Sequence, residues 1–199
     1  LYNLAHTYNT SITTTDINDV CKLEFDFIPQ GDTIRFNYKF GSEEYPDYVC
    51  SDFNDYFAFF INGTPGYPTA TNLAKVPGTN IPVAINTINS CSAGIPPATL
   101  SNCTSMGIGS PFSAYFQNTA SSNTIVYNGT TVLLEAKAAV TPCSTYHMKF
   151  VVADLVDHNY DSGVFLKSGS FKSDAVIFDS IHSPTALPFN WPYATEGCN

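Results

Sequence analysis

The chain has 199 residues, of which 44% are hydrophobic, 14% aromatic and 13% charged, and its 17 acids and 8 bases give a formal net charge of −9. This apolar and aromatic content is typical of a packed core and excludes an acidic disordered tail. No cluster of Lys and Arg is present to neutralise phosphates, so nucleic acid is excluded as a partner. No apolar run approaches the roughly 20 residues that cross a bilayer, so we expect no membrane span.

Most of the sequence before residue 172 has the pattern of short β-strands. Residues 23–29 and 33–40 alternate apolar and polar side chains with period two, and the Gln-Gly-Asp turn between them predicts a hairpin. The aromatic run at 56–61 is typical of a strand covered on both faces. One later segment, 131–140, has an alternative helical pattern, but the Thr-Pro that follows it favours a strand. We expect the remaining strands at 81–88, 124–127, 131–140, 146–155 and 163–171.

Short strands that are separated by Gly, Pro and Asn turns, without helices between them, predict an all-β fold. We expect an antiparallel β-sandwich of jelly-roll type. Residues 63–112 are rich in Pro, Thr, Ser and Gly, and we expect a long loop region there that serves as a lid, a stapled excursion or a binding edge. The expected domain spans residues 1–175, and residues 176–199 are expected to form an exit linker or the start of a following segment.

The six cysteines are dispersed and lack the paired spacing of a zinc site, so disulfides are expected. The pair Cys91–Cys103 is the preferred candidate, because both residues lie in one Ser/Pro/Gly-rich segment, where closure costs the least chain entropy. Burial of some cysteines as free thiols is the alternative. Disulfides, together with abundant Thr, Ser, Asn and Tyr, indicate an extracellular protein.

Eight of the acids are concentrated in two windows of thirteen and eight residues, neither of which contains a Lys or Arg. Like charges at contact distance repel by about 1 kcal/mol per exposed pair. Calcium neutralises such a cluster, because it binds six to eight oxygens in a flexible arrangement. The string from residue 157 to 163 supplies oxygens at every second position, although its glycine spacing is not that of an EF-hand. The two windows contain Glu43, Glu44, Asp47, Asp52 and Asp55, and Asp154, Asp157 and Asp161.

These acids fall at predicted strand ends, so they form one calcium site if those ends meet at the same rim of the sandwich. Two alternatives remain open: solvated acids that keep the rim soluble, or a glycosidase acid/base pair of Glu43 and Glu44, or of one of them with Asp55. The expected calcium ligands are Glu43, Glu44, Asn54, Asp55, Asp157 and Asp161.

Several blocks of the sequence resemble the choice-of-anchor L domain family. The resemblance extends over about residues 1–172, and its most specific parts are the Gly-Ser-Glu-Glu-Tyr-Pro block and the Asn-Asp pair at 54–55. It implies a module of a large secreted protein of bacteria, notably Bacteroidota, and it carries no catalytic activity. Family members usually have a further N-terminal stretch, so we expect that N-terminal strands are missing here. Either the chain is a fragment of a longer polypeptide or these strands come from elsewhere, and an edge of the sandwich is then unpaired or completed by a partner. The matching blocks are 23–29, 40–50, 53–60, 76–80, 145–149 and 161–166.

The resemblance to a Bacteroidota family also implies sites of O-glycosylation. The triplets at 32–34 and 179–181 are similar to the Asp-Ser/Thr-apolar acceptor of that group, which makes Thr33 and Ser180 candidates. We therefore expect a non-catalytic, calcium-stabilised module on the outer surface or outside the cell, serving adhesion or assembly of a larger exported protein. The expected partners are the rest of that polypeptide or a neighbouring subunit, with a surface glycan or a protein as the ligand. A carbohydrate-binding module is the alternative, and a glycoside-processing enzyme is less favoured.

Overall fold

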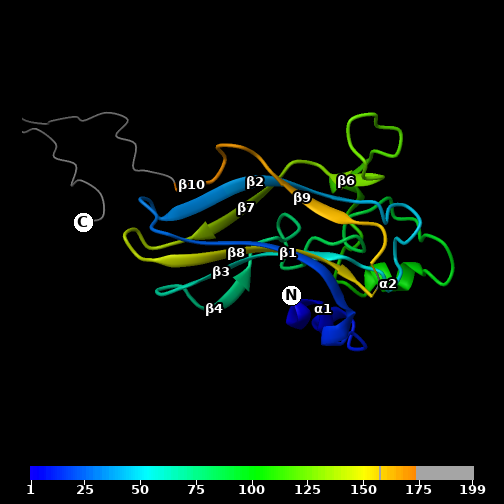
Figure 1. The fold of residues 1–199 in the computed structure, drawn as a ribbon, viewed down its shortest axis with the longest axis horizontal. Helices are drawn as coiled ribbons and strands as arrows, with labels where there is room; N and C mark the ends of the chain where they lie inside the picture. The colour runs from blue at the N-terminus through cyan, green and yellow to red at the C-terminus, as the bar shows by residue number, and fades with distance from the viewer. Residues whose placement is uncertain (157, 174–199) are drawn as a thin grey trace, which may run out of the picture.

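Two antiparallel β-sheets pack face to face in the computed structural model, which describes residues 1–156 and 158–173 (Figure 1). This arrangement confirms the predicted all-β antiparallel sandwich. The first sheet has the order β1 (Ile17–Phe27), β8 (Tyr146–Leu155), β3 (Tyr56–Gly63) and β4 (Tyr67–Asn72). The second sheet is built around β2 (Thr33–Ser42). On one side β2 pairs with β9 (Ser162–Leu166) and β10 (Lys172–Ser173), and on the other side with β7 (Leu134–Ala139) and β6 (Gly129–Thr131). Strand β6 also pairs with β5 (Phe116–Asn118).

Aromatic side chains join the two sheets. The ring of Tyr38 on β2 meets Phe59 on β3 edge to face at 4.7 Å between centroids. One pair further along, Phe40 stacks on Phe57 at 4.8 Å. Such pairs stabilise beyond the apolar area that they bury. As the alternation predicted, one face of β2 lies wholly in the core, and its buried residues are Ile34, Phe36, Tyr38 and Phe40.

The N-terminal segment covers the outer face of the first sheet. It contains α1 (Tyr2–Tyr8) and the 3-10 helix η1 (Thr14–Asp16), neither of which the sequence predicted. Ala5 and Ile12 from this segment are buried against Tyr56 and Leu155. Strand β3 is therefore covered on both faces near its start, as its continuous aromatic run predicted.

The predicted hairpin between residues 23–29 and 33–40 is wrong. Strand β1 pairs with β8 in one sheet, whereas β2 lies in the other sheet. The connection is held by the β7–β8 turn, because the carbonyls of Pro29 and Asp32 accept from Cys143 N (3.0 Å) and Val140 N (2.7 Å). Alternating strands with a short turn between them also fit a corner at which the chain changes sheet, so the local pattern could not distinguish the two arrangements.

The predicted strands at 81–88 and 124–127 are also absent from the part of the chain that the structure describes. Residues 81–88 form a turn-rich buried loop, because Pro82 has no N–H and Thr87 Oγ1 accepts from Ala84 N at 2.8 Å. The long loop region extends from β4 to β5, and the structured segments within it are α2 (Leu100–Thr104) and the 3-10 helix η2 (Ser113–Tyr115). No helix among the described residues is long and apolar enough to cross a membrane.

Cys103 is bonded to Cys50, so the predicted Cys91–Cys103 disulfide is wrong. The long loop folds back over the turn after β2, where Gly94 N and Thr99 N donate to Val49 O and Cys50 O at 2.8 and 3.0 Å. The return of this loop places the α-carbons of Cys50 and Cys103 4.9 Å apart. Cys91 is an exposed free thiol. Distance along the chain was therefore a poor guide to the pairing.

We expect a variant with both Cys50→Ala and Cys103→Ala to lose about 2–5 kcal/mol of unfolding free energy, because the disulfide closes a long loop. Cys91→Ala is the matched control and should change stability by less than about 0.5 kcal/mol, since its side chain is exposed. Denaturant unfolding of the three proteins measures the difference. An equal loss in the control would contradict the assignment.

Candidate functional site

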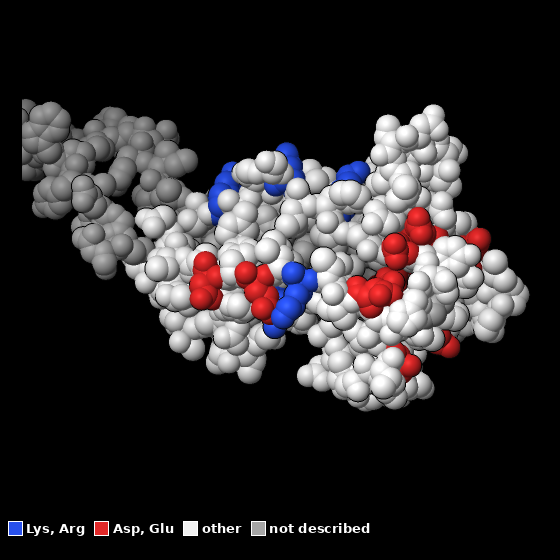
Figure 2. Space-filling view, in the orientation of Figure 1, with Lys and Arg blue, Asp and Glu red and all other residues white. Residues whose placement is uncertain are grey.

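Several acids of the predicted calcium site lie at one end of the sandwich, where β2 ends and β3 and β9 begin. Figure 2 shows acidic side chains over this end, which carries α2 in Figure 1, without Lys or Arg beside them, whereas over the middle of the same face acids lie beside Lys and Arg. The ion pairs that the structure describes for Lys and Arg engage other acids, Glu24 and Glu135. Negative charge is therefore concentrated at this end.

Three carboxylates at this end are buried. Glu44 follows β2, Asp55 precedes β3 and Asp154 lies in β8, and their exposed fractions are 1%, 1% and 4%. Asp55 accepts hydrogen bonds from Leu155 N at 2.9 Å and from Ser162 Oγ at 2.6 Å. It thereby ties the end of β8 and the start of β9 to the start of β3. Burying carboxylates costs free energy unless hydrogen bonds or opposite charges compensate it.

Glu43 and Asp161 lie closer to the surface, beside Tyr127. Glu43 N donates to Asp161 O at 3.1 Å, which joins the loop after β2 to the loop before β9. The ring of Tyr127 covers Gly163, where a β-carbon would collide with the hydroxyl. Burial raises the pKa of Tyr127, and the charges of Asp161, Glu43 and Asp154 raise it further. The acids of both sequence windows therefore act on one side chain.

The expected calcium ligands do not all face the same point. Asn54 points away from the acids into a neighbouring cavity, and Asp157 lies outside the described residues. Within residues 1–156 and 158–173, no group of three His, Cys, Asp or Glu side chains is placed to hold a metal ion. Asp154 belongs to the second acidic window but was not among the expected ligands, although it is one of the three buried acids. The calcium site stays a prediction.

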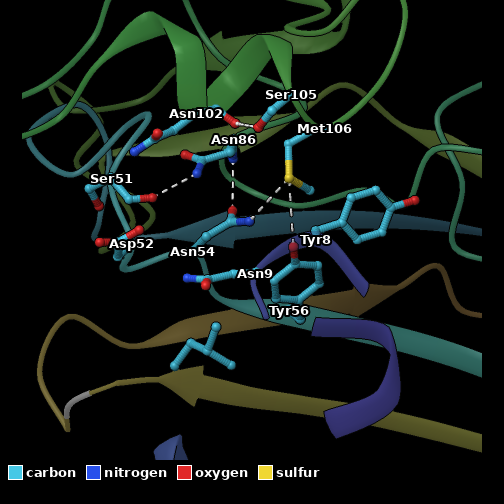
Figure 3. A pocket seen from close by; sticks show the side chains of 11 residues that line it. Tyr8, Asn9, Ser51, Asp52, Asn54, Tyr56, Asn86, Asn102, Ser105 and Met106 are labelled. Carbon is cyan, nitrogen blue, oxygen red and sulfur yellow. Dashed lines mark hydrogen bonds between the residues drawn. The ribbon is translucent and has the colours of Figure 1, made fainter. Parts of the chain in front are cut away.

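The neighbouring cavity has a volume of about 190 Å³ and a mainly polar lining (Figure 3). Its walls come from the end of α1, from the segment between Ser51 and Tyr56, from the loop at Asn86, and from the segment between Asn102 and Met106. Leu155 lines the cavity as well, and its backbone N–H binds Asp55. The cavity and the buried acids are therefore on two sides of the same strand ends.

Amide side chains fix the cavity wall. Asn86 accepts from Cys50 N at 2.6 Å and donates to Ser51 O at 2.8 Å, while its own N–H donates to Asn54 Oδ1 at 2.9 Å. Asn102 Nδ2 donates to Cys50 O at 3.1 Å. Because Cys50 is also bonded to Cys103, the wall is held by both a covalent bond and buried hydrogen bonds. No spacing in the sequence indicated this network, since its members come from segments far apart.

One wall of the cavity contains the aromatic rings of tyrosines and the sulfur atom of Met106. Met106 Sδ accepts from Asn54 Nδ2 at 3.9 Å and from the Tyr56 hydroxyl at 3.8 Å, as Figure 3 shows. Burial of the side chain raises the pKa of Tyr56, and the nearby Tyr8 raises it further. The Tyr56 hydroxyl therefore stays protonated. The only carboxylate that lines the cavity in the described part of the chain is Asp52, which is exposed. The cavity is therefore polar with a single acid.

The sandwich and its acidic end belong to a module of the choice-of-anchor type. The Choice-of-anchor L domain model matches residues 2–172, so the chain belongs to this family, whose domains occur on secreted or surface proteins as parts of larger polypeptides. No curated protein and no solved structure matches the chain significantly.

The two glycosylation candidates differ in what the structure describes. Thr33 begins β2, and its hydroxyl donates to Asp32 Oδ1 at 3.0 Å in an exposed position. Ser180 and the whole segment 176–199 lie outside the described residues. Glycosylation at both positions stays a prediction.

We expect Asp55→Ala to lower the unfolding free energy by about 2–4 kcal/mol in chelator, because it removes the acceptor of two hydrogen bonds and leaves the buried Leu155 N–H without this partner. Asp55→Asn should lose less, because an amide oxygen can still accept from Leu155 N. Denaturant unfolding measures both, and Asp47→Ala is an exposed acid control. Wild-type stability of Asp55→Ala would show that this carboxylate does not hold the strand ends.

Proposed function

We propose that this chain is a non-catalytic module that serves adhesion or assembly of a larger surface protein, and that calcium stabilises its acidic end. The observation that carries the calcium proposal is the burial of Glu44, Asp55 and Asp154 at one end of the sandwich. Ionised carboxylates that lie close together in the interior repel one another more strongly than exposed ones, because little water screens them. A hard cation with flexible oxygen coordination relieves that repulsion.

The loop between β8 and β9 is the natural closing element of such a site. Asp154 lies near the end of β8, just before this loop, and Asp161 lies at the end of the loop, where its carbonyl already accepts from Glu43 N in the loop after β2. An ion between these loops would add a further link between strand ends that Asp55 and the Glu43–Asp161 backbone hydrogen bond already join. This gives the ion a structural role within a module rather than a catalytic one.

The cavity supports a non-catalytic role. Glycoside hydrolysis generally uses two carboxyl groups on either side of the scissile bond. Asp52 is the one carboxylate among the described lining residues, whereas Asp55 binds Leu155 and Ser162 on the far side of the strand. The glycosidase alternative, which required Glu43, Glu44 or Asp55 as a facing pair, is therefore less favoured than a module that binds or assembles.

Thermal unfolding in calcium and in chelator tests the ion. At a calcium concentration about 100-fold above the dissociation constant, binding adds roughly 2.7 kcal/mol, and we expect the midpoint to rise by about 5–10 °C. Asp154→Asn should remove most of this rise, while Asp47→Asn, which removes the same charge from an exposed position, should keep it. An unchanged midpoint in wild type would reject the calcium proposal.

Adhesion is tested separately, by retention of the labelled chain on the outer surface of whole cells in calcium and in chelator. We expect retention that falls when calcium is removed or when Asp154 is replaced. Retention that is independent of calcium would support adhesion while rejecting the role of the ion in it, and no retention on any cell type would reject adhesion.

A further inference from the structure

The polar cavity between α1 and α2 has the size and lining of a site for a small hydroxylated ligand (Figure 3). Its volume of about 190 Å³ corresponds to about six water molecules at roughly 30 Å³ each. This is room for one ring and not for an extended chain. We propose that the cavity binds a single neutral sugar residue, such as the end of a glycan.

The charge of the lining favours a neutral ligand. Among the described residues that form the walls there is no Lys or Arg, and Asp52 is the one charged side chain. An anion would meet this carboxylate and the acids beyond the strand ends without a compensating cation. Repulsion between like charges therefore disfavours phosphates, sulfates and acidic sugars.

Several polar groups at the rim remain available to a ligand. Asn9 uses its side-chain oxygen to accept from Ser11 N at 3.0 Å, which leaves its amide nitrogen as a donor. No hydrogen bond between described residues engages the Tyr8 hydroxyl or the Asp52 carboxylate. The rim therefore offers a donor, an acceptor and a hydroxyl that can do both. Sugar hydroxyls, which donate and accept at once, match this mixture better than a ligand with donors or acceptors alone.

One part of the cavity supplies an apolar surface. Figure 3 shows the ring of Tyr56 below Met106 and the ring of Tyr8 beside it, and Leu155 lines the cavity as well. Sugar rings have an apolar face of C–H groups as well as polar edges, and tyrosine combines an apolar ring with a polar tip. A single ring can therefore bury its apolar face here while its hydroxyls reach the rim.

The site is formed before any ligand arrives. Asn86 and Asn102 are held by backbone groups of Cys50 and Ser51, and the Cys50–Cys103 disulfide joins both walls. Binding therefore requires little ordering of side chains, which is a main cost of association. This inference goes beyond the module role and does not depend on the calcium ion, since none of the lining residues is a buried acid of the neighbouring site.

The test is an NMR titration of the isotope-labelled chain, in calcium-containing buffer, with glucose, galactose, mannose and N-acetylglucosamine. We expect at least one sugar to cause saturable shifts at the amides of residues 9, 52 and 54. Asp52→Asn should weaken that binding about tenfold, and Tyr8→Phe, which keeps the ring, about threefold. Asp47→Asn and Tyr115→Phe make the same chemical changes outside the cavity and should leave the affinity unchanged.

The proposal is overturned if none of the four sugars gives saturable shifts, or if the control variants weaken binding as much as the cavity variants. It is also overturned if methylammonium binds in the cavity and the sugars do not, because the site would then select a cation through Asp52. Thermal midpoints of all four variants show that each is folded, so a loss of binding is assigned to the cavity.

Discussion

The stacking of Phe40 on Phe57 joins the two sheets next to both candidate sites. These two rings are the last aromatic pair between the sheets at the loop end, because β2 ends two residues after Phe40 and β3 begins one residue before Phe57. The pair holds the two strand ends against each other across the core. Glu44 follows the first strand and Asp55 precedes the second, and both are buried at the end of the sandwich that this contact closes. The negative end of the sandwich is a consequence of this packing.

The start of β3, which this contact holds in place, lies between the polar cavity and the acidic end. At the start of β3, consecutive side chains point to opposite sides. Asn54 therefore points into the cavity, where it binds Asn86 and Met106, while Asp55 points to the strand ends of β8 and β9. One short segment thus serves a polar pocket with a single acid on one side and the buried carboxylates on the other. A displacement of this segment would disturb both, which links the polar cavity to the acidic end without any shared ligand.

The sequence predicted the features that depend on local periodicity. The alternation in β2 and the aromatic run in β3 placed these strands correctly, because the pattern of apolar side chains along a strand reflects which of its faces are buried. Prediction from the sequence failed where the contacting residues are far apart along the chain. The corner after Phe27 has the same local pattern as a hairpin, and the buried loop around Ile85 has the apolar content of a strand. Cys50 and Cys103 are 53 residues apart, and only the return of the long loop brings them together.

The candidate sites show the same division. The two acidic windows could be recognised from charge alone, since repulsion is evident wherever eight acids have no base among them. That Asp154 is buried while Asp161 is exposed could not be recognised, because it depends on which side of β8 faces the loop after β2. The cavity itself had no such signal. Asp52 and Asn54 were noted only as part of an acidic window, and Tyr8, Asn86 and Asn102 are ordinary polar residues in separate segments. A pocket built mostly from uncharged polar side chains becomes visible only when the fold has brought its walls together, whereas a charge cluster is already apparent in the sequence.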